Sequence, residues 1–290
     1  MSKISKIKIC SELPIPVLLR DNLRLNEYDF VLFHLYDTNP EYKQYYLNLR
    51  KTHPDRLMIF DNSAYEYFVK GEELNIPKFI KVIIELKPDV YIVPDKLMDV
   101  EETLSLRDIF FNTWTEMLHE GEVTEDEWFW EIKSRPMVVV QGNTSLEMTH
   151  CLVEYYNSNH SCDTPETYIA IPFHNSFFAE MWNTGDKDLD YAQGRRKWFK
   201  ENAGLLRAFK HVHLLGSHKP YEKGWYHEGI VKTFDTAYPI KCAYAGFHLG
   251  NEPFKPEILI DDILDKEPDA ETMALIDENM RIFRTHHMVI

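Results

Sequence analysis

Short apolar runs that alternate with helical patterns constrain the fold of this chain more than any other feature. The stretches VYIVP and MVVVQ are continuous apolar runs, the pattern of strands buried on both faces of a parallel sheet. Between such runs lie segments with helical spacing; in IPKFIKVIIELK, Phe79, Ile83 and Leu86 fall on one stripe. Eight strands are predicted in this way: Lys6–Ser11, Asp29–Tyr36, Arg56–Asp61, Val90–Asp95, Met137–Gln141, Tyr168–Phe173, His211–Gly216 and Val231–Asp235.

Eight strands with intervening helices predict an α/β fold, a (β/α)8 barrel of the TIM type, whose usual length is about 250 residues. We expect a single barrel domain over residues 1–250, with residues 251–290 as a C-terminal helical extension packed on it. A doubly wound open sheet is the structural alternative. It is disfavoured because no glycine-rich phosphate turn follows the first predicted strand.

Composition and the N-terminus indicate a cytoplasmic protein without a membrane partner. No apolar stretch approaches the roughly 20 residues that a membrane span needs, and MSKISKIKIC lacks the apolar core of a signal peptide. The four cysteines, Cys10, Cys151, Cys162 and Cys242, form no CxxC pair. We therefore expect reduced thiols rather than a disulfide framework or a cysteine zinc site.

Polar residues at the predicted strand ends indicate a site, because such residues meet at the mouth of a barrel. Asp61, Asp95 and Gln141 end three successive strands, and Asp235 ends the eighth. One acid after a strand is commonly a cap, but three carboxylates with a carboxamide favour a working site. Paired carboxylates suit displacement at an anomeric carbon, and Asp and Gln can read the edge of a purine. The set fits a glycosidic bond to a nucleobase.

Other chemistries have less support in the sequence. There is no GxSxG elbow, Walker A motif or dinucleotide glycine motif. His211 and His213 alternate on one strand and could bind a metal together with Asp235, so a metal-dependent hydrolase remains an alternative. That class resembles this chain only loosely, since its HxH pair lies on the first strand and this one lies on the seventh. We expect neither a metal nor a cofactor.

The net charge of −15 disfavours a nucleic-acid substrate unless one local basic face exists. The densest basic stretch is GRRKWFK, residues 194–200, which is either a solvated helix face or a loop that reaches over the mouth. Trp198 within it could stack on a base or be buried in a helix. The candidate phosphate-binding residues are Arg195, Arg196, Lys197, Lys200, Lys219 and Lys241.

The ordered motifs resemble the tRNA-guanine transglycosylases. DNSAY is similar to that family's DSGG-plus-aromatic motif, VPDKLMD to its Asp segment after strand four, and VVVQGN to its VQGG. LLGS is similar to LMGVG and TFDTAYP to FDCVLPTR, so the order holds over residues 58–246. The resemblance implies that Asp235 is the nucleophile of a covalent glycosyl-enzyme and that Asp61 is the general acid/base.

The same resemblance implies how the base is held. Asp95 and Gln141 would hydrogen-bond its guanine-like edge, and Tyr65 and Leu215 would sandwich its ring. The backbone around Pro172, Phe173 and Gly216 would complete the base site.

Departures from the family pattern bear on the substrate. Ser63-Ala64 replaces the double glycine, YPIK replaces the PTR stretch, and the zinc subdomain has no counterpart because Cys242 is the only late cysteine. The compact form resembles the phage and bacterial DNA-guanine transglycosylases, the DpdA group. That resemblance implies exchange of guanine in DNA for 7-cyano-7-deazaguanine (preQ0) or an analogue, in the host cytoplasm if the gene is phage-encoded.

Several alternatives stay open. The chain could be a tRNA-guanine transglycosylase, or a glycosidase that only removes the base from a nucleoside or a base-modified nucleotide. It could also be a catalytically inactive module that binds the modified base. A DNA substrate requires the guanine to leave the base stack before its C1′ can be reached. A homodimer is usual in the resembled family, although the family's interface uses the zinc region that this chain lacks.

Overall fold

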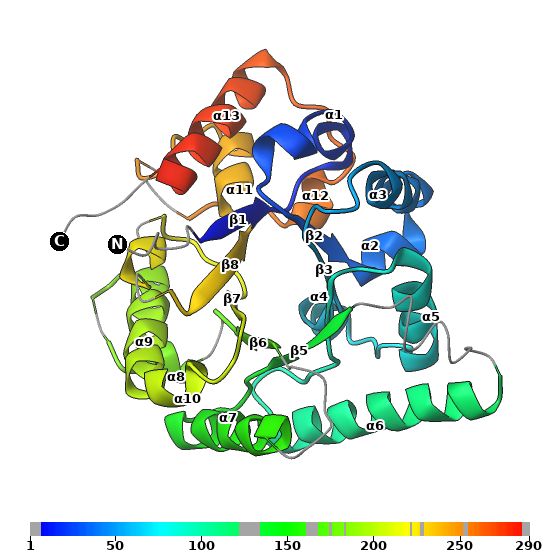
Figure 1. Cartoon of the computed structure of the whole chain (residues 1–290). Coiled ribbons are helices and arrows are strands. Elements are labelled where there is room, and N and C mark those ends of the chain that lie inside the picture. The colour runs from blue at the N-terminus through cyan, green and yellow to red at the C-terminus, as the bar shows by residue number, and fades with distance from the viewer. Residues whose placement is uncertain are drawn as a thin grey trace, which may run out of the picture.

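The computed structural model describes residues 7–121, 134–160, 168–173, 176–182, 184–220, 222–226, 229–251 and 255–285. Its strands form one all-parallel sheet in the order β1-β8-β7-β6-β5-β4-β3-β2, surrounded by helices (Figure 1). The predicted (β/α)8 barrel is therefore confirmed. The strands are β1 Lys8–Ser11, β2 Asp29–Leu32, β3 Met58–Asp61, β4 Val90–Ile92, β5 Arg135–Val139, β6 Tyr168–Ile171, β7 Val212–Leu214 and β8 Val231–Thr236.

Asn26, which lies three residues before β2, binds the end of β1 at the other edge of the sheet. Its Oδ1 accepts from the Ser11 backbone N–H at 2.7 Å, and its Nδ2 donates to the Ser11 carbonyl at 2.9 Å. One side chain thus satisfies both backbone groups at the end of β1, where a ladder to β2 would otherwise be needed.

The helices begin at signals that can be read from the sequence. The side chains of Asn39, Asn75 and Asp99 each accept a backbone N–H in the first turn of the helix that follows. The helices are α1 Ile15–Leu25, α2 Phe33–Thr38, α3 Pro40–Thr52, α4 Ala64–Lys70, α5 Ile76–Leu86, α6 Val100–His119, α7 Ser145–His160, α8 Ser176–Glu180, α9 Lys187–Glu201, α10 Ala203–Leu206, the 3₁₀ turn η2 Glu222–Trp225, α11 Tyr238–Tyr244, α12 Ile260–Ile263 and α13 Ala270–Thr285.

The core lies inside the barrel and between the sheet and its helices. The predicted stripe of α5 packs inward, where the rings of Phe79 and Phe60 stack with centroids 5.2 Å apart. Phe33 meets both of these rings edge-on. Aromatic packing of this kind attaches α5 and α2 to β3.

The second predicted strand is too long. It ends at Leu32, and residues 33–38 turn at once into α2. The apolar residues Phe33, Leu35 and Tyr36 are buried from the helix instead of continuing a strand. The continuous apolar run could not distinguish these two states, since both bury the same side chains.

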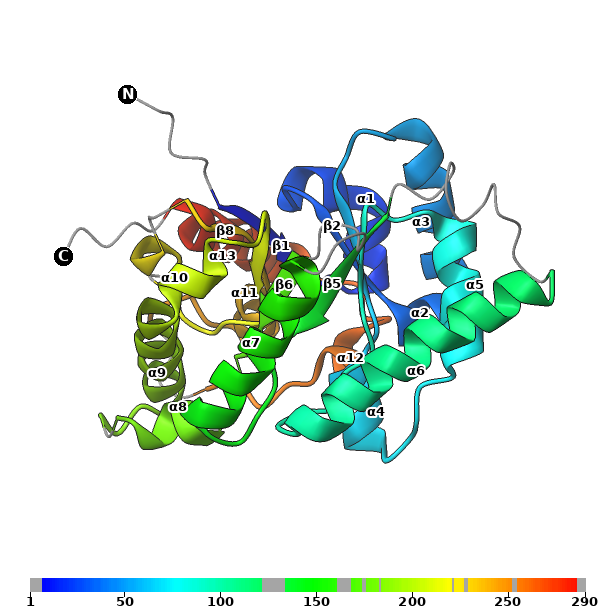
Figure 2. The same cartoon turned by 60° about the horizontal axis from the view of Figure 1, so that its bottom comes forward.

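The C-terminal segment packs against the barrel. In α13, Phe283 contacts the ring of Phe234 in β8, and the buried amide of Asn279 binds the backbone of Pro239, Phe247 and Leu249. Figure 2 shows α12 at the same end of the barrel as α4. Among the described helices, none is both long enough and apolar enough to cross a membrane.

Candidate active site

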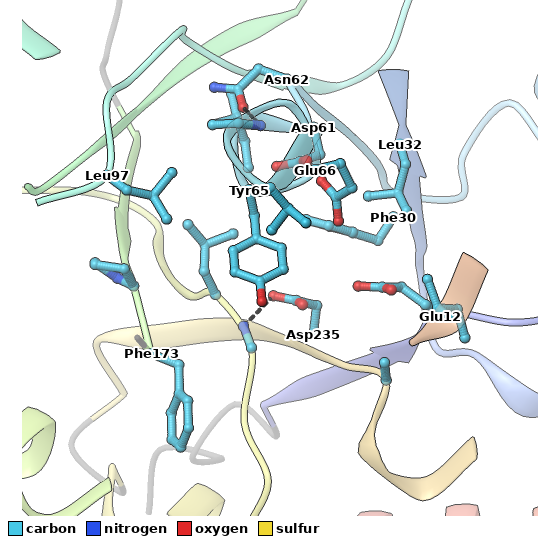
Figure 3. A pocket seen from close by; sticks show the side chains of 18 of the residues that line it. Glu12, Phe30, Leu32, Asp61, Asn62, Tyr65, Glu66, Leu97, Phe173 and Asp235 are labelled. Atoms are coloured by element: carbon cyan, nitrogen blue, oxygen red, sulfur yellow. Dashed lines mark hydrogen bonds between the residues drawn. The ribbon is translucent and has the colours of Figure 1, made fainter. Parts of the chain in front are cut away.

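A cavity of about 280 Å³ opens at the carboxyl-terminal mouth of the barrel (Figure 3). Its walls come from the ends of several strands, from α4 and from the segment around α12. The structure brings together every residue expected to act on the base: Asp61, Tyr65, Asp95, Gln141, Pro172, Phe173, Leu215, Gly216 and Asp235 all line this one cavity.

Asp61 ends β3 and is held by the tight turn that follows. Its Oδ2 accepts from the backbone N–H of Ser63 at 2.7 Å, and Ser63 itself has the left-handed backbone angle φ of 59°. The hydroxyl of Ser63 lies 2.9 Å from His34 Nδ1, which fixes the turn from the β2 side. Burial raises the pKa of Asp61 well above its usual range, and the nearby Glu66 raises it further. A carboxyl group of this kind is suited to act as an acid.

The carboxylate of Asp95 accepts hydrogen bonds from two side-chain amides. Asn62 Nδ2 donates to Asp95 Oδ1 at 2.8 Å, and Gln141 Nε2 donates to Asp95 Oδ2 at 2.7 Å. The Gln141 Oε1 atom in turn accepts from the backbone N–H of Met98 at 2.9 Å. Burial raises the pKa of Asp95, whereas the hydrogen bonds from the Asn62 and Gln141 side chains lower it. The network leaves lone pairs on Asp95 and one N–H of Gln141 for a ligand.

Asp235 lies at the end of β8 with one oxygen bound and the other open. Its Oδ1 accepts from the Gly216 backbone N–H at 2.8 Å and lies 3.0 Å from His213 Nε2. Its Oδ2 accepts no hydrogen bond from the described residues. An oriented carboxylate with one open oxygen has the geometry of a nucleophile.

Two histidines and Thr233 form a chain that ends at Asp235. His211 Nε2 lies 2.5 Å from Thr233 Oγ1, which lies 2.8 Å from His213 Nδ1. In the tautomer of His213 that donates from Nε2 to the carboxylate, Nδ1 can accept from the Thr233 hydroxyl, whose oxygen can accept from His211 Nε2. Burial lowers the pKa of His211 to about 3, so this ring stays neutral.

The hydrolase-like metal set is not assembled. Only His213 of the HxH pair reaches Asp235, and His211 Nε2 is bonded to Thr233. Within the described ranges, no three His, Cys, Asp or Glu side chains gather closely enough to hold a metal ion. The thiols of Cys10, Cys151 and Cys242 are buried and form no disulfide within the described part of the chain, whereas Cys162 lies outside the described residues.

Two glutamates in the cavity were not predicted. Glu12 directly follows β1, and Glu66 lies on α4; their carboxyl groups face the same space as those of Asp61 and Asp235 in Figure 3. Burial raises the pKa of Glu12 to about 8 and that of Glu66 to about 7, with help from neighbouring carboxylates. Glu12 could have been found by the strand-end rule that selected Asp61.

The wall around α12 was also missed. Leu259, Ile260 and Asp261 line the cavity, and Asp261 forms an ion pair with Lys70 of α4 at 3.4 Å. The C-terminal extension therefore forms part of the site. Nothing in the local sequence signals this role, because it depends on where the chain returns after β8.

The residues expected to hold a base differ in orientation. Tyr65 is 47% exposed, and its ring extends from α4 across the cavity towards Asp235. The ring of Phe173 is directed away from the cavity and packs against His218, with centroids 4.8 Å apart. At Phe173 it is therefore the backbone that faces a ligand. His174, which follows it, lies outside the described residues.

The phosphate-binding prediction for Arg195 is wrong. GRRKWFK lies within α9 rather than in a loop over the mouth, and Arg195 is 0% exposed in an ion pair with Glu222. A buried, paired guanidinium cannot reach a phosphate. Trp198 is likewise buried, as the helix interpretation predicted.

The remaining basic candidates have different surroundings. Arg196 packs over the ring of Trp225, and Lys219 forms an ion pair with Asp186 at 2.6 Å. Lys197 and Lys200 are exposed on α9. Among the six candidates, Lys241 alone lines the cavity. The expected basic face is thus reduced to scattered side chains.

No protein-family model matches this chain, and no curated protein matches it.

Proposed function

We propose that this protein is a base-exchange transglycosylase. It would replace a guanine base in DNA with a 7-deazaguanine such as preQ0, while the sugar and the phosphate backbone stay in place. One observation carries the proposal: Asp61, an acid with a raised pKa, and Asp235, an oriented carboxylate with an open oxygen, face one cavity. Acid catalysis at the leaving base and attack at the sugar carbon need two carboxyl groups in these different states.

In the first half of the reaction, Asp235 Oδ2 attacks C1′ while the bond from C1′ to N9 of guanine breaks. The electron pair of that bond passes to N9, which takes the proton of Asp61. The products are free guanine, an ester between Asp235 and the sugar, and an ionised Asp61. Hydrogen bonds from Gly216 and His213 to Oδ1 hold the attacking group in place.

In the second half, the incoming base enters in place of guanine. Its N9–H gives the proton to the Asp61 carboxylate, and the N9 electron pair attacks C1′. The ester bond breaks and returns the Asp235 carboxylate, so the configuration at C1′ is retained. Both groups end in their starting states, and no co-reactant is consumed.

Recognition of the base is assigned to the other side of the cavity. Asp95, oriented by Asn62 and Gln141, accepts from the N–H groups of a guanine-like edge. Tyr65 covers one face of the ring, and Leu215 lies in the wall for the other. Guanine and 7-deazaguanine share this edge, which is what an exchange reaction requires.

A second candidate is the same chemistry on a free nucleoside. The charge of the mouth favours it, since Glu12, Glu66 and Asp261 line the cavity with only Lys70 and Lys241 as cations among its described lining residues. Carboxylates repel phosphates, whereas they accept hydrogen bonds from sugar hydroxyls.

The test is a trapping and exchange experiment. The protein is incubated with guanine-containing DNA, tRNA or deoxyguanosine, with and without preQ0, and analysed by mass spectrometry for a denaturation-resistant adduct and for incorporated base. We expect an adduct on DNA, loss of the adduct in Asp235→Ala, and slow formation in Asp61→Asn. Asp89→Asn, which changes a carboxylate on the opposite face beside Arg50, is the matched control.

The result with each of the three substrates distinguishes between the candidate functions. Exchange on deoxyguanosine but not on polymers would replace the DNA proposal with the nucleoside one, and exchange on tRNA alone would identify a tRNA enzyme. No adduct and no exchange on any of the three would reject the transglycosylase proposal. Binding of preQ0 without an adduct would identify a binding module.

A further inference from the structure

Arg195 is a fully buried cation whose guanidinium grips the backbone next to the cavity. Its Nη1 donates to the Leu215 carbonyl at 2.9 Å and to the Ile171 carbonyl at 3.3 Å, and its Nη2 donates to the Gly216 carbonyl at 2.9 Å. Ile171 is the last residue of β6, and Leu215 and Gly216 are the first two residues of the loop that follows β7. One side chain thus holds the end of β6 and the loop after β7 together.

Glu222 completes this buried cluster. Its Oε1 accepts from Arg195 Nε at 2.8 Å and its Oε2 from the Ser217 hydroxyl at 2.5 Å. Glu222 is 0% exposed, like Arg195. The Ser217 carbonyl accepts from Thr236 Oγ1 at 2.5 Å, which connects the cluster to the end of β8 beside Asp235. The loop after β7 is therefore held at three successive residues.

The backbone amide of Gly216 is the group of this loop that binds Asp235. Gly216 has the left-handed angle φ of 62°, and its N–H donates to Asp235 Oδ1. Its carbonyl, on the opposite side of the same residue, is the one held by Arg195. A shift of the guanidinium would move this amide and with it the nearest donor to the carboxylate.

The local sequence explains how α9 comes close enough. At Gly194 a Cβ atom would lie 2.2 Å from the Phe178 carbonyl oxygen, so α9 can approach the backbone of α8 only because this residue is glycine. The neighbouring Arg195 then reaches the ends of β6 and β7 from the helix side of the sheet, and its guanidinium lies 4.9 Å from the centre of the Phe173 ring. The GRR stretch thus contributes to the site from behind its wall.

We propose that Arg195 is a positioning residue that holds the Gly216 amide in register with the attacking carboxylate of Asp235. The chemical part of this inference rests on the proposed base-exchange function, whereas the positioning of Gly216 does not. Arg195 touches no reacting atom, and it acts through the loop backbone. Glu222 compensates its charge, because a lone buried cation would be strongly destabilising.

The test uses Arg195→Lys, which keeps the charge but loses the fork that reaches three carbonyls. Two quantities are measured: the rate of adduct formation with guanine-containing DNA, and hydrogen exchange of the Gly216 amide by NMR. We expect the rate to fall about 100-fold, the usual cost of a displacement of about 1 Å at a reacting group. Gly216 exchange should become faster, while the affinity for DNA changes little.

The matched control is Arg56→Lys at the other end of the barrel. Arg56 also forms a fork, to buried Asp29 and to the carbonyls of Asn26 and Tyr28. Its loss should lower stability without changing Gly216 exchange or the adduct rate, which separates positioning from general destabilisation. If Arg195→Lys does not fold, the paired variant Arg195→Met with Glu222→Gln removes the fork without leaving a lone charge.

The outcomes separate the two proposals. Unchanged Gly216 exchange in the folded variant would overturn the positioning role, and so would an unchanged adduct rate. If the wild-type protein forms no adduct with any substrate, the proposed function fails. Gly216 exchange then decides alone: faster exchange supports the positioning role, and unchanged exchange rejects it.

Discussion

The side-chain amide of Asn62 connects the strand end that carries Asp61 to the carboxylate of Asp95, and all three residues line the cavity. Asn62 follows Asp61 directly in the chain, and its Nδ2 donates to Asp95 Oδ1 at 2.8 Å and to the Val93 carbonyl at 2.8 Å. Its Oδ1 accepts from the backbone N–H of Ala64 at 2.8 Å. Asn62 therefore sets the ends of β3 and β4 relative to each other.

Asn62→Ala is expected to destabilise the protein and to disturb Asp95. The substitution leaves the buried Val93 carbonyl and one Asp95 oxygen without this donor, which costs about 1–3 kcal/mol. Urea denaturation measures the loss in free energy of unfolding. Asn48→Ala, which removes an exposed amide that accepts from Gln44, is the control and should change the stability little. Equal effects of the two substitutions would contradict the role assigned to Asn62.

The raised pKa of Glu12 predicts a pH dependence of stability. In the unfolded chain a glutamate titrates near 4.3, whereas in the folded protein the pKa of Glu12 is about 8. Between these two pH values the folded state holds a proton on Glu12 that the unfolded chain has lost. The contribution of Glu12 to the free energy of unfolding is therefore fully present below about pH 4.3 and is lost as pH rises through about 8. Glu12→Gln should remove this part of the decline and be the more stable protein at pH 9.

Urea denaturation from pH 5 to pH 9 measures this difference. Glu12→Gln is compared with Glu41→Gln, a change at an exposed glutamate on α3. The curve for Glu12→Gln should be flatter than that of the wild type, and the curve for Glu41→Gln should follow the wild type. Parallel curves for Glu12→Gln and the wild type would show that Glu12 is ionised across this range.

Tyr65→Ala is expected to weaken binding of the incoming base. Stacking of a base on an aromatic ring contributes about 1–3 kcal/mol, and the ring of Tyr65 extends across the cavity. Tyr65→Phe keeps the ring and should retain most of the affinity for preQ0 measured by calorimetry. Phe68→Ala changes a ring on the same helix that is 53% exposed and does not line the cavity, so it should have no effect. Equal losses from Tyr65→Ala and Phe68→Ala would reject stacking at this position.

The barrel and the strand-end carboxylates could be predicted from the sequence for a physical reason. Parallel strands that are buried on both faces form continuous apolar runs, and the residue after each run is fixed at the mouth by topology alone. Asp61, Asp95 and Asp235 were found in this way, and all three line the cavity. Glu12 obeys the same rule after β1 and was overlooked.

The rest of the site depends on long-range packing. Asp261 reaches the mouth because the chain returns there after β8, a path that no local pattern encodes. The sequence predicts a surface position for Arg195, because a charged stretch on a helix is usually solvated. The burial of its side chain follows from the contact of Gly194 with α8 and from Glu222, which lies 27 residues further along the chain.

Gly194→Ala is expected to destabilise the protein because the added methyl group has no space. Its Cβ would lie 2.2 Å from the Phe178 carbonyl oxygen and 2.5 Å from the Phe178 Cα, both backbone atoms that can yield only if α8 and α9 separate. Overpacking of this kind costs about 1–3 kcal/mol. Gly204→Ala in α10 is the matched control, since among the described residues no atom beyond the local backbone lies within 4 Å of an added Cβ. It should leave stability unchanged or raise it by about 0.4–1 kcal/mol. Urea denaturation of both variants compares these effects, and a Gly194→Ala protein as stable as the wild type would show that α9 does not depend on this close approach.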